Sequence, residues 1–231
     1  MKIRPPRTGR KSKVEPRLDR SQIVQAALDL LDAVGFDGLT MRSLAKKLGV
    51  KAASLYWHVH DKQDLLSLLA DEICASMREP DRALPWRKQL EELGYEYRRV
   101  LLAHRDAARV LAGSGVPSGP HRLRLTEILL RTLLEAAFNR KDAAYAGFLL
   151  NDYITMFVLD ETLDVNVQAE DGSEDATSHV QNWIKALSPD DYPSLIALAD
   201  YLTEPDAEER FRFGVEILGN GLETRLAGQK T

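Results

Sequence analysis

Between Thr40 and Lys62 the chain holds a dense set of side chains that could contact a polyanion. Arg42 and Lys62 place positive charge at the two ends of this stretch, where contacts with phosphates would fix the protein on nucleic acid. Small residues open its second half, and they let a helix N-terminus approach base edges or phosphates closely. Aromatic and imidazole side chains follow, with hydrogen-bond donors on apolar bodies. The remaining candidates for contact with DNA are Thr40, Ala52, Ala53, Ser54, Tyr56, Trp57 and His58.

These side chains fall on two short predicted helices joined by a tight turn. Thr40 is a suitable N-cap, because its oxygen can accept from free N–H groups of the first turn. Apolar residues then recur at helical spacing until Gly49, which can adopt the left-handed conformation that ends a helix. A second helix is predicted from about Ala52 to Val59, with Leu55 and Val59 on one side. Such a helix-turn-helix can enter a DNA major groove, although an ordinary helical hairpin would show the same pattern.

Charge is distributed unevenly along the chain. Residues 1–62 contain 13 Lys/Arg and 6 Asp/Glu, whereas the rest contains 18 and 29. A basic N-terminal part on an acidic body indicates a polyanion partner at one end, or else a solvated asymmetry. Within it, residues 1–17 carry prolines and few apolar groups, so they cannot build a core. We expect a flexible basic arm that lays Arg4, Arg7 and Arg10 into a minor groove, with a solubilising tail or expression remnant as the alternative.

Helical patterns continue to the C-terminus. Asp19 and Gln22 form a capping-box pattern at the start of a helix over 18–34, which Gly35 ends. Since no long stretch alternates at period two, we predict an all-α fold without a sheet. Loops are expected at 113–120 and at the acidic stretch 168–179. The further helices are predicted at about 61–78, 87–103, 106–112, 121–138, 141–164, 192–203 and 206–227.

The run from Leu18 to Leu69, with GFDGLTMRSLAKKLGV followed by LYWHVHDKQDLL, resembles the DNA-binding domain of the tetracycline-repressor (TetR) family. The likeness continues more weakly through LLAHRDAARVLAG and FRFGVEILGNGLETRL, so it covers most of the chain. It implies an all-helical homodimer that represses transcription and is released by a small ligand. It also implies a ligand cavity among the helices of the C-terminal body. On those helices the candidate ligand-binding residues are Trp86, Tyr97, Leu101, His104 and Leu111.

The sequence departs from the tetracycline-responsive members of that family. In those members a histidine just after the HRD-like segment binds the drug's magnesium, and here Leu111 stands at that position. Arg78, Leu93 and Tyr97 stand where His, Asn and Phe contact the drug, and the Arg-Pro pair of the family is missing after Gly113. We therefore expect a largely apolar effector that binds without magnesium, and we predict no metal or other cofactor.

The helix over 141–164 is apolar on most sides, as expected for a helix buried between neighbours. Polar residues interrupt it, and a polar group in such surroundings needs a partner, either another side chain or a ligand. A filled core, or a dimer seam over 148–157, would explain the same pattern. The candidates for ligand contact on this helix are Phe148, Asn151, Asp152 and Thr155.

The last helix carries glycines that would let another helix approach closely. Gly214 and Gly221 are seven residues apart, and glycine within a helix costs about 1 kcal/mol relative to alanine, so a packing reason is expected. The resemblance favours an intersubunit four-helix bundle over packing within one chain. The predicted dimerisation residues are Phe211, Gly214, Leu218, Gly221 and Leu222.

Enzymatic motifs are missing from the sequence, which has no phosphate-binding glycine loop, HExxH or GxSxG. No apolar run approaches the roughly 20 residues that cross a bilayer. The single cysteine, Cys74, cannot form an internal disulfide, which favours a reducing cytoplasm.

We therefore predict a basic arm over 1–17, a helix-turn-helix domain over 18–79, and a ligand-binding and dimerisation domain over 80–231. The predicted function is a ligand-responsive repressor, with double-stranded DNA, a small effector and a second copy of the chain as partners. A transcriptional activator of the same fold stays open, as does a small-molecule-binding protein or enzyme with an incidental basic end.

Overall fold

The computed structural model describes residues 18–171, 176–203 and 206–229, and every regular element in these ranges is a helix. The predicted all-α fold is confirmed. The elements are α1 Arg20–Gly38, α2 Met41–Leu48, α3 Ala52–Tyr56, α4 Lys62–Ile73, the 3-10 turn η1 Cys74–Ser76, α5 Trp86–Leu102, α6 Ala107–Gly113, α7 Pro120–Glu135, α8 Arg140–Asp171, α9 Ala176–Lys185, α10 Pro193–Ala197, α11 Ala199–Thr203 and α12 Ala207–Ala227.

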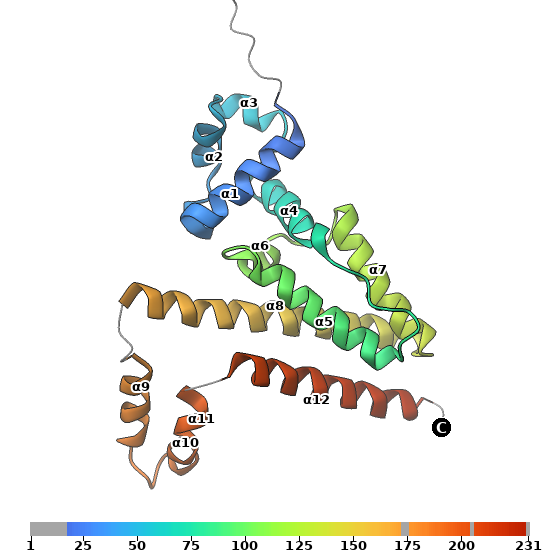
Figure 1. Ribbon diagram of the computed structural model, residues 1–231, viewed down its shortest axis with the longest axis vertical. Helices are drawn as coiled ribbons and strands as arrows, with labels where there is room; N and C mark the ends of the chain where they lie inside the picture. The colour runs from blue at the N-terminus through green and yellow to red at the C-terminus, as the bar shows by residue number, and fades with distance from the viewer. Residues whose placement is uncertain (1–17, 172–175, 204–205, 230–231) are drawn as a thin grey trace, which may run out of the picture.

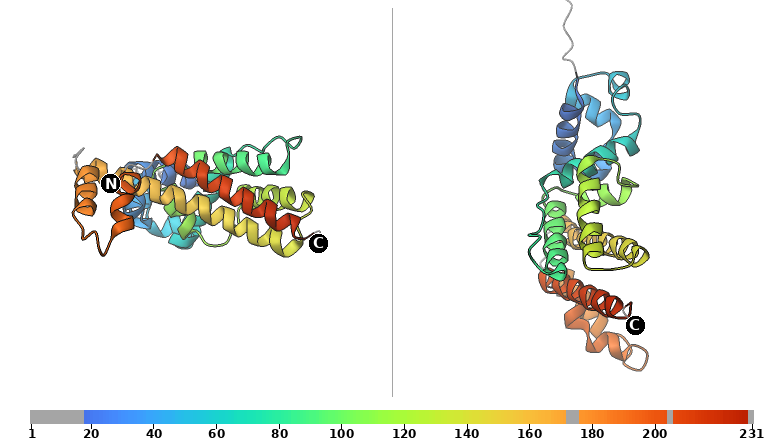
Figure 2. Two further views of the ribbon diagram at one scale, coloured as in Figure 1. Left: turned by 90° about the horizontal axis from the view of Figure 1, so that it is seen from below. Right: turned by 90° about the vertical axis from the view of Figure 1, so that its right-hand side faces the viewer.

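The helices form a small head and a larger body (Figure 1). The head contains α1 to α3, and α4 leads from it to the body, which contains α5 to α8 and α12. The helices α8 and α12 run side by side in opposite directions, as both views of Figure 2 show. The short helices α9 to α11 lie at one end of this pair. The chain therefore has the helix-turn-helix at one end and the long antiparallel helices α8 and α12 toward the other.

Local capping explains where the helices of the head begin and end. The Asp19 carboxylate accepts from the Gln22 amide at 2.8 Å, and the Gln22 side chain accepts from the Asp19 amide at 3.2 Å. Thr40 caps α2 in the same way through the Ser43 amide. Gly49 ends α2 at φ 67°, a left-handed conformation that glycine adopts without steric cost. The predicted caps are confirmed.

Two helices at the junction are shorter than predicted. Helix α3 ends at Tyr56 instead of Val59, because the amides of His58 and Val59 turn back to the Leu55 carbonyl. Helix α4 ends at Ile73 and continues only as η1, so the helix expected over 61–78 covers just part of that range. At the C-terminal ends of α3 and α4 the backbone forms turns, and the spacing of apolar residues does not predict them.

The body differs from expectation around the acidic stretch 168–179. Helix α8 extends to Asp171 and α9 begins at Ala176, so the loop prediction was wrong for both flanks, while residues 172–175 lie outside the described residues. A shortage of apolar side chains argues against burial, but Ala, Gln and Glu are good helix formers and keep the backbone helical. The helix expected over 192–203 is divided into α10 and α11 at Leu198.

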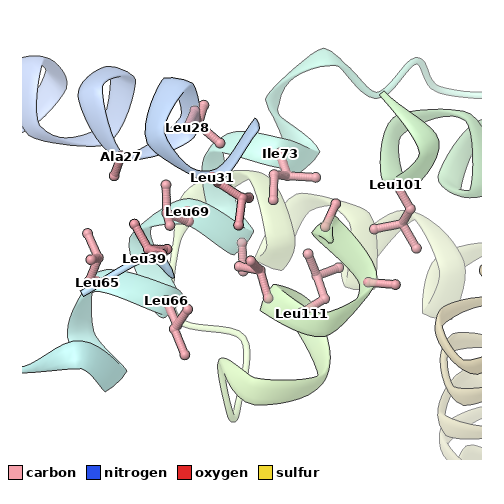
Figure 3. Close-up of a cluster of buried hydrophobic side chains, with 14 of the residues drawn as sticks. Ala27, Leu28, Leu31, Leu39, Leu65, Leu66, Leu69, Ile73, Leu101 and Leu111 are labelled. Atoms are coloured by element: carbon pink, nitrogen blue, oxygen red, sulfur yellow. The ribbon is translucent and has the colours of Figure 1, made fainter. Parts of the chain in front are cut away.

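One hydrophobic core joins the head to the body. Figure 3 shows Leu28 and Leu31 of α1 and Leu69 of α4 close to Leu101 of α5 and Leu111 of α6. A second cluster lies where α7, α8 and α12 meet, around Leu133 and Phe138. Helices α1 and α4 share their core with α5 and α6. A rearrangement of side chains in the body would therefore alter the packing that holds α4 and α1 of the head.

Candidate functional site

Helix α3 is held by one side and exposed on the other. Leu55 and Val59 are fully buried in the shared core, so the residues between them point outward. Trp57 is 86% exposed and Tyr56 is about half exposed. Large exposed aromatic side chains next to small residues at a helix start give a surface that fits a groove and its phosphates. This geometry is that of a nucleic-acid interface.

The structure places the predicted DNA-contacting residues in three settings. Thr40 is exposed but uses its hydroxyl to cap α2. Lys62 is half-buried, with its amine 4.6 Å from the centre of the Phe36 ring, and Ser54 is also half-buried. The others are exposed: Arg42, Ala52, Ala53, Tyr56, Trp57 and His58. Arg4, Arg7 and Arg10 lie outside the described residues.

Sequence reasoning missed three exposed cations beside this surface. Lys46 and Lys47 end α2, and Lys51 precedes α3 as its N-cap residue. Lys47 is 3.6 Å from the Asp29 carboxylate, so part of its charge is already matched. All three lie in the run KKLGVK, and the positive charge of that run could have indicated contact with DNA.

The head meets the body through polar contacts around the Gly35–Phe36 bend of α1. Gly35 has φ 71°, and the next amide, that of Phe36, donates to the Asp106 carboxylate at 2.8 Å. Arg109 binds Asp37 through two hydrogen bonds of 3.0 and 3.1 Å, which hold the pKa of Asp37 below its usual value. The Arg109 guanidinium also lies 4.6 Å from the centre of the Phe36 ring. Asp106 and Arg109 therefore fix the bend from the body side.

His104 belongs to this joint and lies away from the polar residues predicted to bind the ligand. Its Nδ1 is 3.1 Å from the Asp32 carboxylate of α1, and the Arg105 amide donates to the same group at 3.0 Å. The structure places His104 at the contact with α1, and its assignment to the ligand site stays a prediction.

Helix α4 is fixed to the segment between α6 and α7 by three side chains, four residues apart. Gln63 donates to the Gly113 carbonyl at 2.8 Å, and Ser67 donates to the Ser114 carbonyl at 3.0 Å. One turn further on, the Asp71 carboxylate accepts from the Arg122 amide at 2.9 Å. A spacing of four places these side chains on one face of α4. We call Gln63, Ser67 and Asp71 the α4 ladder.

Part of the predicted ligand site forms a polar cluster between α5 and α8, in which Tyr97 and Thr155 are buried and Asn151 is exposed. The Tyr97 hydroxyl lies 3.3 Å from both the Asn151 side-chain oxygen and the Thr155 hydroxyl. Burial raises the pKa of the Tyr97 hydroxyl, which keeps it protonated and able to donate. Asp152 is exposed beside Asn151, whose amide donates to it at 3.3 Å. These four predicted ligand contacts thus lie close together, and their role in ligand binding stays a prediction.

Other predicted ligand residues lie elsewhere. Leu101 and Leu111 are buried in the core shared with the head. Phe148 points outward and is 69% exposed. Trp86 borders an open cavity of about 460 Å³ between α5 and α12. Apolar and aromatic side chains line part of that cavity: Trp86, Leu90, Tyr95, Leu150, Val215 and Leu222.

Metal and membrane sites were also sought in the described parts of the chain. No three His, Cys, Asp or Glu side chains there gather closely enough to hold a metal ion. Within the same residues, no helix combines the length and the apolar character needed to cross a bilayer.

Family models match both parts of the chain. Residues 23–69 match the bacterial regulatory proteins of the tetR family, and residues 79–226 match the tetracyclin repressor-like C-terminal domain. The chain belongs to the TetR family. It is thus a ligand-responsive, DNA-binding regulator of transcription that acts as a homodimer.

Individual relatives agree with this membership. The class D tetracycline repressor protein of Escherichia coli is 33% identical over 217 residues, covering 91% of each chain. The TetR family protein ActR of Streptomyces coelicolor, solved in complex with (S)-DNPA, is 33% identical with a TM-score of 0.79, covering 90% of this chain and 98% of that one. BioQ of Mycobacterium smegmatis, solved with its double-stranded DNA operator, is 28% identical with a TM-score of 0.66, covering 89% and 98%.

Most residues predicted for the seam of the TetR dimer pack within their own chain in the structure. Phe211 is 0% exposed within its own chain, where it packs against Tyr95, Tyr153 and Phe157. A Cβ added at Gly214 would overlap the Tyr153 ring, so that glycine has a packing reason inside one chain. Leu218 and Leu222 face the second core cluster, and Gly221 alone of the predicted set is exposed.

Different residues form the exposed apolar face of these two helices. Helical spacing places 145, 149, 152 and 156 on one side of α8, and 213, 217 and 221 on one side of α12. In a single chain this face leaves large apolar side chains in water. We call them the α8/α12 face: Tyr145, Phe148, Leu149, Met156, Phe213 and Ile217.

Proposed function

We propose that this chain is a repressor whose homodimer binds a two-fold operator and leaves it when a small, largely apolar molecule enters the body. Two helix-turn-helix units related by a dimer axis would read two half-sites of the operator. The residues proposed to contact DNA are those exposed on α2 and α3, together with Lys62 and the lysines beside them. The basic residues 1–17 are proposed as an accessory arm.

The observation that carries the proposal for the effector is the polar cluster of Tyr97, Asn151 and Thr155, in which Tyr97 and Thr155 are buried and Asn151 is exposed. Most of its surroundings are apolar, and polar groups in such a place give a ligand its orientation. Arg122 belongs to the α7 segment that the α4 ladder holds, and its positive charge lowers the pKa of Tyr97 against the larger effect of burial. A ligand that moves α5, α7 or α8 would thus act on α4 and on the head.

Magnesium has no evident role in this proposal. Leu111, at the position of the metal-binding histidine in tetracycline-responsive members, is buried in the hydrophobic core and offers no ligand atom. Leu93 is likewise buried and apolar. We infer an organic effector bound by hydrogen bonds and apolar contacts, with no catalytic step. Because its target is DNA, we place the protein in the cytoplasm, with DNA binding assigned to 18–79 and effector binding and dimerisation to 80–231.

The proposal is tested by fluorescence anisotropy with labelled DNA from upstream of the protein's own gene. We expect tight binding to one palindromic site, and release of that site by a subset of small organic compounds at constant EDTA. A promoter–reporter fusion, with and without the regulator, separates repression from activation. Failure to bind any DNA more tightly than random sequence would reject the proposal.

A further inference from the structure

Arg122, near the start of α7, is a buried cation without an ionic partner. Its residue surface is 9% exposed, and its Nη1 is buried with no hydrogen-bond partner. Its Nη2 donates to the Gly115 carbonyl at 3.2 Å. None of the carboxylates in the described part of the chain comes within 4.0 Å of its guanidinium nitrogens. One half of this guanidinium fork therefore has its hydrogen-bonding capacity unused.

A second buried arginine shows how the same chain satisfies such a group elsewhere. Arg98 is 8% exposed. It donates two hydrogen bonds to Glu161, of 2.7 and 3.1 Å, and one to Glu208, of 2.5 Å. It also stacks over the Phe211 ring at 4.8 Å from the ring centre. Arg131 also has two buried nitrogens without a hydrogen-bond partner, Nε and Nη2, but its Nη2 lies 3.8 Å from the Glu79 carboxylate. Of these three arginines, only Arg122 has no carboxylate of the described residues within 4.0 Å of its guanidinium.

The Arg122 charge acts on the polar cluster proposed for the effector. Burial raises the pKa of the Cys74 thiol to about 12, and the positive charge of Arg122 opposes that shift. Burial also raises the pKa of Tyr97, again with Arg122 acting in the opposite direction. Two carboxylates face this region, Asp71 beside Cys74 and Asp152 beside Tyr97. Asp71 uses one oxygen on the Arg122 backbone amide.

An unpaired buried guanidinium destabilises a protein, because desolvation is not repaid by a partner. A carboxylate matches its two parallel N–H groups in bidentate geometry. We propose that Arg122 receives a carboxylate of the effector, so that inducers of this regulator are amphipathic organic acids. The apolar part of such an acid would contact the surroundings of Tyr97. This inference rests on the proposed function and names the chemical class of the effector.

The first test needs no effector. Replacing Arg122 by Met removes the unpaired charge and keeps an unbranched apolar stem, so the melting temperature of the free protein should rise by about 2–4 °C. The matched control is Arg98→Met, which leaves Glu161 buried beside an apolar group and should lower the melting temperature. A lower melting temperature for Arg122→Met would mean that Arg122 is a structural residue, and would overturn the proposal.

The second test compares an acid with its neutral isostere. Calorimetric titration of the full-length dimer with 2-naphthoate and 2-naphthamide should show the acid binding at least about tenfold more tightly. The preference should be lost in Arg122→Gln and kept in Arg131→Gln, a change at the half-buried arginine on the opposite side of α7. Equal binding of the two probes, no binding of the acid, or an unchanged preference in Arg122→Gln would overturn the proposal.

Operator anisotropy on the same samples separates the two levels of inference. If neutral compounds release the operator while the acid preference is absent, only the role of Arg122 is rejected. If no compound of either kind releases the operator, the proposed function itself is rejected.

Discussion

Leu55 and Trp57 are two positions apart and have opposite environments. Leu55 is fully buried and holds α3 to the core, whereas Trp57 is 86% exposed. Most large apolar side chains that contribute to folding lose their contact with water, so folding gives no reason for a tryptophan at 57. Contact with DNA gives one, because an aromatic body with an N–H donor can pack against sugar and bind phosphate.

Replacing Trp57 by Ala should therefore separate binding from stability. We expect an unchanged melting temperature and a loss of operator affinity of about 10- to 30-fold, as for truncation of a central aromatic anchor. Anisotropy and thermal melts on the same samples measure both quantities. Trp183→Ala in α9, also exposed but remote from α3, is the matched control and should alter neither. Wild-type affinity in Trp57→Ala would remove this side chain from the interface.

The location of the effector is also a question about single side chains, because the chain offers two sites. One is the polar cluster of Tyr97, and the other is the open cavity between α5 and α12. Tyr97→Phe removes only the hydroxyl, and Val215→Trp partly fills the cavity.

We predict that Tyr97→Phe weakens effector binding about tenfold, since one buried hydrogen bond contributes about 1 kcal/mol and leaves Thr155 unsatisfied when lost. Val215→Trp should leave the affinity unchanged. Calorimetry with any compound that releases the operator measures both. The reverse result would assign the effector to the cavity between α5 and α12.

At the scale of helices, the α4 ladder is one of the polar links between the body and the head. Gln63 and Ser67 bind carbonyls at the end of α6, and α4 packs against α1 in the shared core. A ligand changes DNA affinity only by the difference in free energy that it imposes on the two states of the protein. We expect the hydrogen bonds of the α4 ladder to contribute part of that difference in free energy between the two states.

The double variant Gln63→Ala, Ser67→Ala should thus bind effector and operator separately with near wild-type affinity, but respond less to the effector. Two lost hydrogen bonds correspond to about 1–3 kcal/mol, so the effector-induced fall in operator affinity should shrink by about 5- to 150-fold. Anisotropy titrations at zero and saturating effector give the ratio. Gln25→Ala, which removes an exposed hydrogen bond within α1, is the control. An unchanged ratio would show that coupling takes another path.

Element boundaries fixed by local chemistry could be predicted from sequence, and those fixed by distant contacts could not. Asp19, Thr40 and Gly49 act within four residues of their own position, so their roles are visible in the sequence. Gly35 was expected to end the first helix and does break it, at φ 71°, but α1 continues to Gly38. The hydrogen bond from the Phe36 amide to Asp106, seventy residues away, has no local pattern that signals it.

Periodicity has a related limit. It identified the apolar side of α12 that contains Phe211 but could not tell whether the same chain or a second copy covers that side. In the structure the same chain covers it, with Tyr95, Tyr153 and Phe157. The cluster of Tyr97, Asn151 and Thr155 was predictable because polar residues interrupt an apolar helix, whereas the unpaired state of Arg122 needed three dimensions.

At the scale of the whole molecule, the head and the body each expose side chains that folding of one chain does not explain. The head exposes cations and aromatic side chains on a short helix-turn-helix, and the far side of the body exposes the α8/α12 face. Contiguous apolar faces of this kind on a regulator that acts as a homodimer are best covered by a second copy.

Introducing charge into this face should prevent dimerisation without unfolding the chain. In Phe213→Asp, Ile217→Asp, two exposed side chains of α12 are changed, so each monomer keeps its buried core around Phe211. Burying two carboxylates in an apolar seam would cost several kcal/mol, so we expect monomers in analytical ultracentrifugation and unchanged helix content by circular dichroism. Val116→Asp, an exposed apolar residue in the α6–α7 loop, is the control and should stay dimeric.

Operator binding in the same variant then tests whether symmetry matters for function. A dimer binds its second half-site as an intramolecular event, so a monomer loses that gain while each head keeps its own contacts. The affinity for the full operator should fall by about 10²- to 10⁴-fold. Binding to a single half-site, measured with a half-length duplex, should change little. A monomeric variant that still binds the full operator tightly would show that the two heads act independently, and the α8/α12 face would then serve a purpose other than operator recognition.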